Sequence, residues 1–333
     1  MDLLVVEVPQ EDFNHEKGNK MNSCSLFLLF WKNKKKISYS LIGDTMAKKY
    51  ISYLGVLVLA CFSFYYTDRA VDIVKRNDPI MKSILAHSKD YTVDSVNATI
   101  SNDEITGGRN GKKVNVDKSY QNMKKIDEYN ESMLVFDEVI PDITLLNTFD
   151  KYIVGGNTDK NQVSLIFKID DIYYVDTLNQ ILLDKNVLAT FFMDGDVVEK
   201  NMNQVLELVS NGYEIENLGY DGNYTLDRFG WTNNMISSLT NRDTKFCYTD
   251  YKNSNILDLC SSYKMYTVKP TISVSNYPFS TVKKELSSGS IISFNVNDST
   301  LKELPSIISY IKQKGFDLVT LEELIRENLV DEK

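Results

Sequence analysis

The sequence predicts an α/β fold, in which a parallel sheet is wrapped by helices, preceded by one transmembrane helix and a small α+β prefix. Two observations lead to this prediction. From Val163 to the C-terminus, short apolar runs typical of buried strands alternate with segments whose apolar residues recur at helical spacing. Closer to the N-terminus, residues 50–67 form an uncharged run of 18 positions, about the shortest length that spans a bilayer as a helix.

Composition and charge narrow the classes of function. The chain has 333 residues, of which 43% are hydrophobic and 25% charged, as expected for a globular protein with more than one segment. A net charge of −9 argues against a surface that binds phosphates, so nucleic acid is excluded as a partner. The two histidines, His15 and His87, both precede the α/β region, which therefore lacks the commonest metal ligand.

The N-terminal segments predict a single-pass protein of the cell membrane. Basic residues precede the apolar run, so the positive-inside rule predicts a cytoplasmic N-terminus and an extracytoplasmic C-terminal domain. Residues 1–49 are then a cytoplasmic tail, or an over-extended start upstream of Met46. A cleaved signal peptide is the alternative, but the sequence SFYYTDR that follows the run lacks a small-x-small cleavage site. A lipoprotein signal ending at Cys61 fits less well, because Leu59 is large.

Two further segments separate this anchor from the α/β domain. Residues 68–113 are polar with little periodicity, and we expect a linker or stalk. Residues 114–160 combine helical spacing in VDKSYQNMKKI with a strand-like run in SMLVFDEVIP, which predicts a small ordered prefix.

Residues 161–330 are expected to form the α/β domain itself. Strands are predicted at VSLIF, LATFF, YEIEN, TKFCYT, KMYTVK, SIISFNV and FDLVT, with helical segments between them. With about seven such repeats, a barrel is favoured over an open sheet. Thr320 and Glu323 form a capping box at the start of the last helix, and glycines typical of left-handed helix ends stand at Gly212, Gly289 and Gly315.

The stretch LLDKNVLATFFMDGDVVEKNMNQVLELVSNGYEIEN resembles the polysaccharide deacetylase family, the carbohydrate esterases with a NodB homology domain. In that family an ATFF strand, a glycine, a helix and a G-[HY]-E-I-x-N strand follow in this order. The later SGSIISFNVND and LPSIISYIKQKGFDLVTLEEL resemble the end of the same domain. The resemblance covers residues 160–328 and implies a distorted (β/α) barrel with metal-dependent removal of acetyl groups from cell-wall or extracellular glycans. An unrelated barrel remains the alternative.

The motif positions that carry this chemistry are replaced. Active members hold a divalent metal such as zinc with two histidines and an aspartate, beside a carboxylate base and a general acid. In this sequence the base and the metal-binding aspartate align with Lys168 and Ile169, and the two histidines align with Leu218 and Gly222. The resemblance therefore implies a degenerate member without a metal cofactor. Two further motif residues are also lost: the arginine aligns with Cys247 and the acid histidine with Asn295.

Two hypotheses about function follow. The first is a non-catalytic protein of cell-wall carbohydrate metabolism, a pseudoenzyme that binds a glycan or docks other envelope proteins. The second is a divergent hydrolase whose carboxylate-based site would use Asp170, Asp171 and Asp221. Asp170 and Asp171 recover the motif only if the chain bulges after the strand; otherwise they are acids of a solvated turn. Other acids expected near the strand ends are Asp194, Asp196 and Glu216, and an oxygen-only cluster would favour calcium or magnesium.

Aromatic residues in the loops after the strands are candidates for glycan binding, because sugars stack on aromatic faces without any metal. The candidates are Tyr173, Tyr220, Trp231, Tyr248 and Tyr251. The alternative is that a chain with 20 tyrosines places them everywhere.

Cys247 and Cys260 are predicted to form a disulfide. Cys247 is expected at the end of a strand and Cys260 on the inward face of the next helix, in a domain predicted to be extracytoplasmic. Two buried thiols are the alternative.

Overall fold

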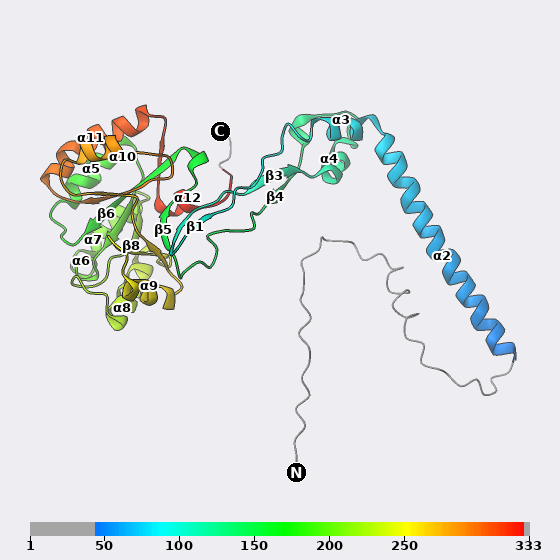
Figure 1. Ribbon diagram of the computed structural model, residues 1–333, viewed down its shortest axis with the longest axis horizontal. Helices are drawn as coiled ribbons and strands as arrows, with labels where there is room; N and C mark the ends of the chain where they lie inside the picture. Colours follow the sequence, from blue (N-terminus) through cyan, green and yellow to red (C-terminus); the bar gives the residue numbers. More distant parts are fainter. Residues whose placement is uncertain (1–43, 330–333) are drawn as a thin grey trace, which may run out of the picture. The chain divides into compact units, whose positions relative to one another are not determined.

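The computed structural model describes residues 44–329, and the chain divides into two units at Lys82 and Ser83 (Figure 1). The first unit is described from Asp44 onward. The expectations for the rest of the tail and for the last four residues lie outside the described residues.

The first unit consists mainly of one long helix, α2 (Asp44–Asn77), drawn in blue in Figure 1. Within it, Ser52–Asn77 is 26 residues long with a mean hydropathy of 1.3, which is long and apolar enough to cross a bilayer. The helix continues past residue 67, the expected end of the apolar run, because the following residues include good helix formers and no glycine. It ends shortly before Pro79, whose ring disfavours helical geometry in the preceding residue.

The first part of the second unit is built from short elements. They are the end of α3 (Pro79–His87), β1 (Thr99–Ser101), β2 (Glu104–Thr106), β3 (Gly111–Val114), α4 (Val116–Met123), the 3₁₀ helix η1 (Glu131–Met133) and β4 (Phe136–Val139). β3 and β4 form a separate antiparallel pair, and β1 and β2 form a hairpin at one end of the main sheet. Residues 68–113, which we expected to be a linker, therefore contain helical and strand residues.

The α/β domain begins with β5 (Tyr152–Gly155), within the expected prefix. It continues with η2 (Thr158–Lys160), β6 (Gln162–Ile169), α5 (Val175–Lys185), β7 (Thr190–Met193), α6 (Gly195–Lys200), α7 (Met202–Ser210), β8 (Glu214–Asn217), α8 (Leu226–Thr240), β9 (Phe246–Tyr248), α9 (Ser254–Ser262), β10 (Tyr266–Val268), β11 (Ile272–Val274), α10 (Pro278–Glu285), β12 (Ile291–Asn295), α11 (Asp298–Gln313), β13 (Asp317–Val319) and α12 (Leu321–Ile325). Every strand predicted for this domain is present; β5 and β11 were not foreseen.

The strands form one curled sheet in the order β1-β2-β5-β10-β9-β8-β7-β6-β12-β11, and β13 pairs with the first half of β6. All pairs from β2 to β11 along this order are parallel. The curl brings Gly156, just after β5, against Gly289, just before β12, where the Gly156 amide donates to the Gly289 carbonyl at 2.9 Å. Only glycine fits at position 289, because its φ is +81° and a Cβ would lie 2.4 Å from the Gly156 oxygen. The fold is the predicted distorted (β/α) barrel.

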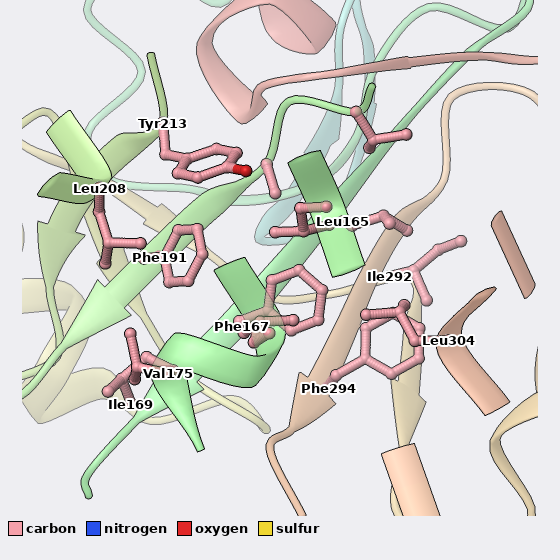
Figure 2. Close-up of a cluster of buried hydrophobic side chains, with 14 of the residues drawn as sticks. Leu165, Phe167, Ile169, Val175, Phe191, Leu208, Tyr213, Ile292, Phe294 and Leu304 are labelled. Atoms are coloured by element: carbon pink, nitrogen blue, oxygen red, sulfur yellow. The ribbon is translucent and has the colours of Figure 1, made fainter. Parts of the chain in front are cut away.

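Side chains at alternate positions of each strand pack on opposite faces of the sheet. Phe167 and Ile169 of β6 belong to the core between the sheet and its helices, where Phe167 stacks on Phe294 with ring centroids 5.5 Å apart (Figure 2). Ile166 faces the other way and packs with Phe192 of β7 in a second cluster. Because side chains alternate along a strand, Lys168 continues the side of Ile166.

The predicted helix boundaries at Thr320, Gly212 and Gly315 are confirmed, whereas Gly289 does not end a helix, because α10 ends at Glu285 with Leu286 as its C-cap. Thr320 caps α12 by accepting a hydrogen bond from the Glu323 amide at 3.4 Å. Gly212 and Gly315 follow α7 and α11 in the left-handed conformation, with φ of +84° and +82°.

Candidate functional site

A cleft of about 550 Å³ opens where several parallel strands end. Its lining includes Lys168 of β6, Leu218 after β8, Tyr248 of β9 and Asn295 of β12. This is the end of the sheet at which α/β folds place their sites, because the loops that follow the strands converge there. The cleft therefore contains eight of the positions singled out in the sequence, since Asp170, Asp194, Gly222 and Tyr251 line it as well.

Lys168 and Asp250 form an ion pair in the lining of the cleft. The Lys168 Nζ donates to both carboxylate oxygens of Asp250, at 3.0 and 2.9 Å, and lies 5.1 Å from the centre of the Tyr248 ring. The Tyr248 hydroxyl donates to Asp250 Oδ1 at 2.5 Å and lies 2.9 Å from Ser293 Oγ. Burial, together with the hydrogen bond to Asp250, raises the pKa of Tyr248 far above its usual value, so this hydroxyl stays protonated.

Asp194 organises the loop beside the cleft. Its carboxylate accepts hydrogen bonds from the backbone amides of Asp196, Asp221 and Gly222, each at 2.9 Å. The residue is only 4% exposed, and as N-cap of α6 it also satisfies the start of that helix. Both oxygens of Asp194 are therefore engaged in holding the backbone.

The loop after β8 carries the two positions that align with the metal-binding histidines. Asn217 fixes its start, because its Oδ1 accepts from the Gly219 amide at 2.6 Å while its Nδ2 donates to the Phe229 carbonyl at 3.0 Å. Leu218 and Gly222 both line the cleft. Gly222 has a φ of +68° and open space around its Cα.

The strand β6 shows no bulge at its end. Lys168 pairs with Asn295 and Ile169 pairs with Met193 in an unbroken register, so these two residues occupy the aligned motif positions. Ile169 is 1% exposed and belongs to the core. Asp170 is exposed and lines the cleft.

The acids proposed for a hydrolytic site do not gather in the cleft. Asp171 is turned away, because its Oδ1 accepts from the Tyr173 amide at 3.0 Å in a local turn. Asp221 is exposed at a φ of +50° and does not line the cleft. Asp196 forms an ion pair with Lys200 at 2.7 Å. Glu216 is buried, and its carboxylate accepts hydrogen bonds from the backbone amides of Lys245 and Phe246.

The aromatic candidates divide into two groups. Tyr248 and Tyr251 line the cleft, and Tyr251 is 69% exposed. Tyr220 and Trp231 pack on each other outside it, with ring centroids 5.3 Å apart, and Tyr173 packs on its neighbour in the sequence.

Contributors to the site that were missed in the sequence include Asp250, Asn223 and Asn253, whereas Tyr224 belongs to the aromatic loop segments already considered for glycan binding. Tyr224 supports the wall through a hydrogen bond from its hydroxyl to the Tyr248 carbonyl, at 3.0 Å. Asp250 stands between two tyrosines in the YTDY segment after β9. Its carboxyl group next to a strand end was the available signal.

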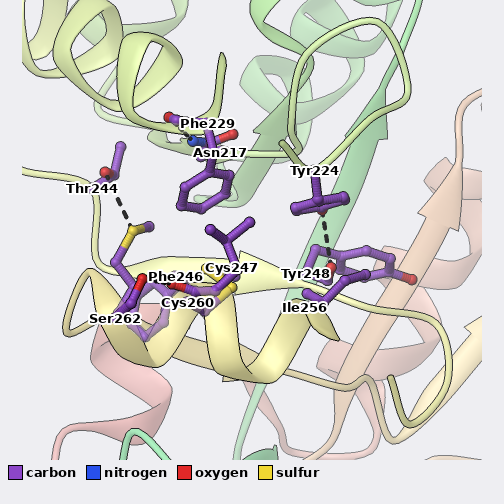
Figure 3. Close-up of a disulfide and its surroundings, with 12 residues drawn as sticks. Asn217, Tyr224, Phe229, Thr244, Phe246, Cys247, Tyr248, Ile256, Cys260 and Ser262 are labelled. Carbon is purple, nitrogen blue, oxygen red and sulfur yellow. Dashed lines mark hydrogen bonds between the residues drawn. A yellow bond between two sulfur atoms is a disulfide. The ribbon is translucent and has the colours of Figure 1, made fainter. Parts of the chain in front are cut away.

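Cys247 and Cys260 form a disulfide with Cα atoms 6.2 Å apart (Figure 3). The bond joins β9 to α9 in a small apolar cluster with Phe229 and Met265. The segment between the two cysteines supplies one wall of the cleft, including Tyr248, Asp250 and Tyr251. Cys247, which stands at the aligned arginine position, is therefore buried behind this wall and supports it through the disulfide.

The residues at the cleft do not fit a catalytic metal. Leu218, Gly222 and Ile169 offer no donor atom, and the Asp194 oxygens are already engaged. Among residues 44–329 no group of three or more His, Cys, Asp and Glu side chains is arranged to hold a metal ion.

Comparison with known proteins identifies the family. Residues 155–284 match the family model of the polysaccharide deacetylases. The matched part of the chain is a polysaccharide deacetylase-like domain. Its motif positions at Lys168, Ile169, Leu218 and Gly222 make it a degenerate member of that family.

Several proteins are similar to this chain over most of its length. The uncharacterized protein YlxY of Bacillus subtilis (strain 168) is 26% identical over 316 residues, covering 85% of this chain and 98% of the relative. The crystal structure of a wild-type CE4 family pseudoenzyme from Bacillus anthracis is 25% identical with a TM-score of 0.60, covering 77% of this chain and 98% of that one. A mutant of the same pseudoenzyme covers 75% of this chain and 99% of its own, at 24% identity and a TM-score of 0.60.

Proposed function

We propose that this protein is a membrane-anchored, extracytoplasmic member of the polysaccharide deacetylase family that binds a cell-wall or extracellular glycan without deacetylating it. One observation carries the proposal. The cleft at the strand ends is retained, whereas the positions that would hold the metal and its base contain Lys168, Ile169, Leu218 and Gly222.

Lys168 supports the non-catalytic part of the proposal. Its ammonium lies where the resemblance places a carboxylate base, and Asp250 holds it there with both oxygens. An ammonium at that point offers no lone pair to a divalent cation and cannot accept a proton from water. The similarity to a CE4 family pseudoenzyme agrees with this.

The cleft itself supports glycan binding. Its volume of about 550 Å³ lies in the range of small-molecule sites. Tyr251 offers an exposed aromatic face, and Asn223 and Asn295 offer amide groups that can exchange hydrogen bonds with sugar hydroxyls. None of these contacts requires a metal.

The anchor is supported by α2, with its apolar stretch Ser52–Asn77. Lysines precede this stretch, and by the positive-inside rule they favour a cytoplasmic N-terminus. The domain would then face the compartment in which cell-wall glycans lie.

The test uses the full-length chain purified in detergent. We expect it to be retained on peptidoglycan or chitin in the presence of a chelator, and to release no acetate from acetylated oligosaccharides with or without added zinc. Metal-dependent acetate release at an ordinary enzymatic rate would overturn the non-catalytic part. Acetate release that needs no metal and disappears in Asp170→Ala would establish the carboxylate hydrolase instead. Absence of retention on both glycans would leave docking of envelope proteins.

A second experiment restores the aligned ligands. The mutant of the Bacillus anthracis pseudoenzyme is described as having restored enzymatic activity. Here the replacements are Lys168→Asp, Ile169→Asp, Leu218→His and Gly222→His. Position 222 has open space for the imidazole, although its left-handed backbone costs a non-glycine residue about 1 kcal/mol. We expect the variant to bind zinc by elemental analysis, whereas the parent chain does not.

A further inference from the structure

We infer that the cleft prefers a glycan whose sugars carry a free amino group to the N-acetylated form of the same glycan. The inference rests on the proposed glycan binding and concerns the charge balance inside the cleft. Four charged side chains line it: Lys168, Asp170, Asp194 and Asp250. One of these groups is positive and three are negative. The carboxylate that has no positive or hydrogen-bonding partner therefore decides which ligand charge the cleft favours.

Lys168 and Asp250 compensate each other. The ammonium donates to both oxygens of the carboxylate, and the Lys168 side chain is only 18% exposed. A ligand cation in the cleft therefore meets a neutral pair, with the lysine charge at its base already held by a partner.

Asp194 is compensated by the backbone. Three peptide N–H groups point at its carboxylate, each with a nitrogen–oxygen distance of 2.9 Å, and the residue is 4% exposed. Oriented amide dipoles stabilise a carboxylate as a counter-ion does, so little of this charge is available to a ligand.

Asp170 is the charge that remains. It follows β6 directly, is exposed and lines the cleft, and among the described residues its carboxylate has no hydrogen-bond or ion-pair partner. Its neighbour Asp171 uses an oxygen to close a local turn and stays outside the cleft. The cleft therefore presents one unpaired carboxylate to its contents.

A protonated sugar amine matches this carboxylate in charge and in hydrogen bonding. The ammonium offers three donors, of which one can pair with Asp170 while others reach neutral oxygens such as the side-chain carbonyl of Asn295. An N-acetyl group is neutral and bulkier, so its single amide N–H can donate one uncharged hydrogen bond to the carboxylate but brings no opposite charge.

Such a glycan arises by hydrolysis of N-acetyl groups. The protein would therefore recognise what an active deacetylase leaves behind, and the reaction that supplies its ligand is the one that its own cleft has lost.

The test compares two defined probes, the tetramer of glucosamine and the tetramer of N-acetylglucosamine, by titration calorimetry with the full-length chain in detergent at mildly acidic pH. We expect the amino form to bind about threefold to fivefold more tightly, the size of one partly exposed ion pair. The preference should shrink in high salt and as the pH rises above the pKa of the amine. Asp170→Asn should abolish the preference by weakening binding of the glucosamine tetramer.

Asp171→Asn is the matched control. It removes the same charge from the next residue, so a preference that came only from the net charge of the protein would fall equally in both variants. Equal binding of the two tetramers, tighter binding of the acetylated one, or a preference that survives Asp170→Asn would each overturn the inference and leave the proposed function standing. Binding of neither tetramer would remove both.

Discussion

Lys168 Nζ lies 2.9 Å from Asp250 Oδ2 at the base of the cleft and links the ends of two strands that are 82 residues apart in the chain. Lys168 stands at the position that aligns with the carboxylate base of active family members. The ion pair gives the cleft a fixed floor, because the Tyr248 hydroxyl also donates to Asp250. The same contacts therefore hold this side of the cleft in place.

Removing the Lys168 side chain should destabilise the folded protein. In Lys168→Ala, Asp250 and Tyr248 lose their cationic neighbour, and we expect a loss of about 1 kcal/mol in the free energy of unfolding, measured by urea titration. Lys200→Ala is the control, because that lysine pairs with Asp196 on the surface with a 68% exposed side chain. A loss no larger than in the control would show that the pair is not structural.

The exposed tyrosine in the cleft should carry part of the affinity for glycan. Tyr251→Ala is expected to weaken retention on peptidoglycan or chitin by about 1–2 kcal/mol. Trp231→Ala provides the comparison, since this aromatic residue packs on Tyr220 outside the cleft and should leave retention unchanged. Equal losses in the two variants would place the glycan elsewhere.

The disulfide should stabilise the wall that carries Tyr248 and Tyr251. Cys247 and Cys260 are 13 residues apart, and closing a loop of this length stabilises a fold by about 3 kcal/mol. We expect dithiothreitol to lower the melting temperature of the parent chain and to weaken retention on glycan, with no further effect on the double variant Cys247→Ala and Cys260→Ala. A melting temperature that does not respond to the reductant would contradict this role.

Glu216 should make the stability depend on pH. Its burial, and next the charge of Glu214, raise its pKa well above the usual value. A raised pKa of an acid in the folded state means that the stabilising form is protonated. Its contribution is therefore complete below the unfolded-state pKa and is lost as the pH rises through the folded-state pKa. Glu216→Gln keeps the acceptor for the amides of Lys245 and Phe246, so we expect it to be more stable than the parent at neutral pH by at least about 1 kcal/mol.

Glu322 provides the control of opposite sign for the Glu216 experiment. Its burial alone would raise the pKa, but the hydrogen bond and charge of Lys245 and the charge of Arg242 lower it overall. Its contribution is therefore present above the unfolded-state pKa and is lost as the pH falls through the folded-state value. Glu322→Gln should lower the melting temperature at neutral pH, whereas Glu216→Gln should raise it.

Local patterns in the sequence were enough to predict most of the barrel. The strands and helices after Val163 are regular and flanked by cap residues such as Gly212 and Thr320, so each element carries its own signal. β2 and β5 carry weaker signals, because they are three or four residues long and depend on pairing with each other across a long separation in the chain.

The site was predicted less completely for the same physical reason. The replaced positions could be found by alignment, but the partner of Lys168 lies on another strand, and no spacing rule connects the two. The turn made by Asp171 also separates two adjacent acids into one inside the cleft and one outside it, a difference set by a single local hydrogen bond.

The position of β6 in the sheet has a consequence for how the protein is made. This strand is the first of the predicted series, yet one of its edges is covered by β12 and part of the other by β13, which begins at Asp317. A ribosome makes β12 and β13 only after all the strands and helices that lie between them and β6, so until then this strand of eight residues has exposed edges. The growing chain must therefore be kept from aggregating until these two strands are available, and the barrel closes only after β13 has been made.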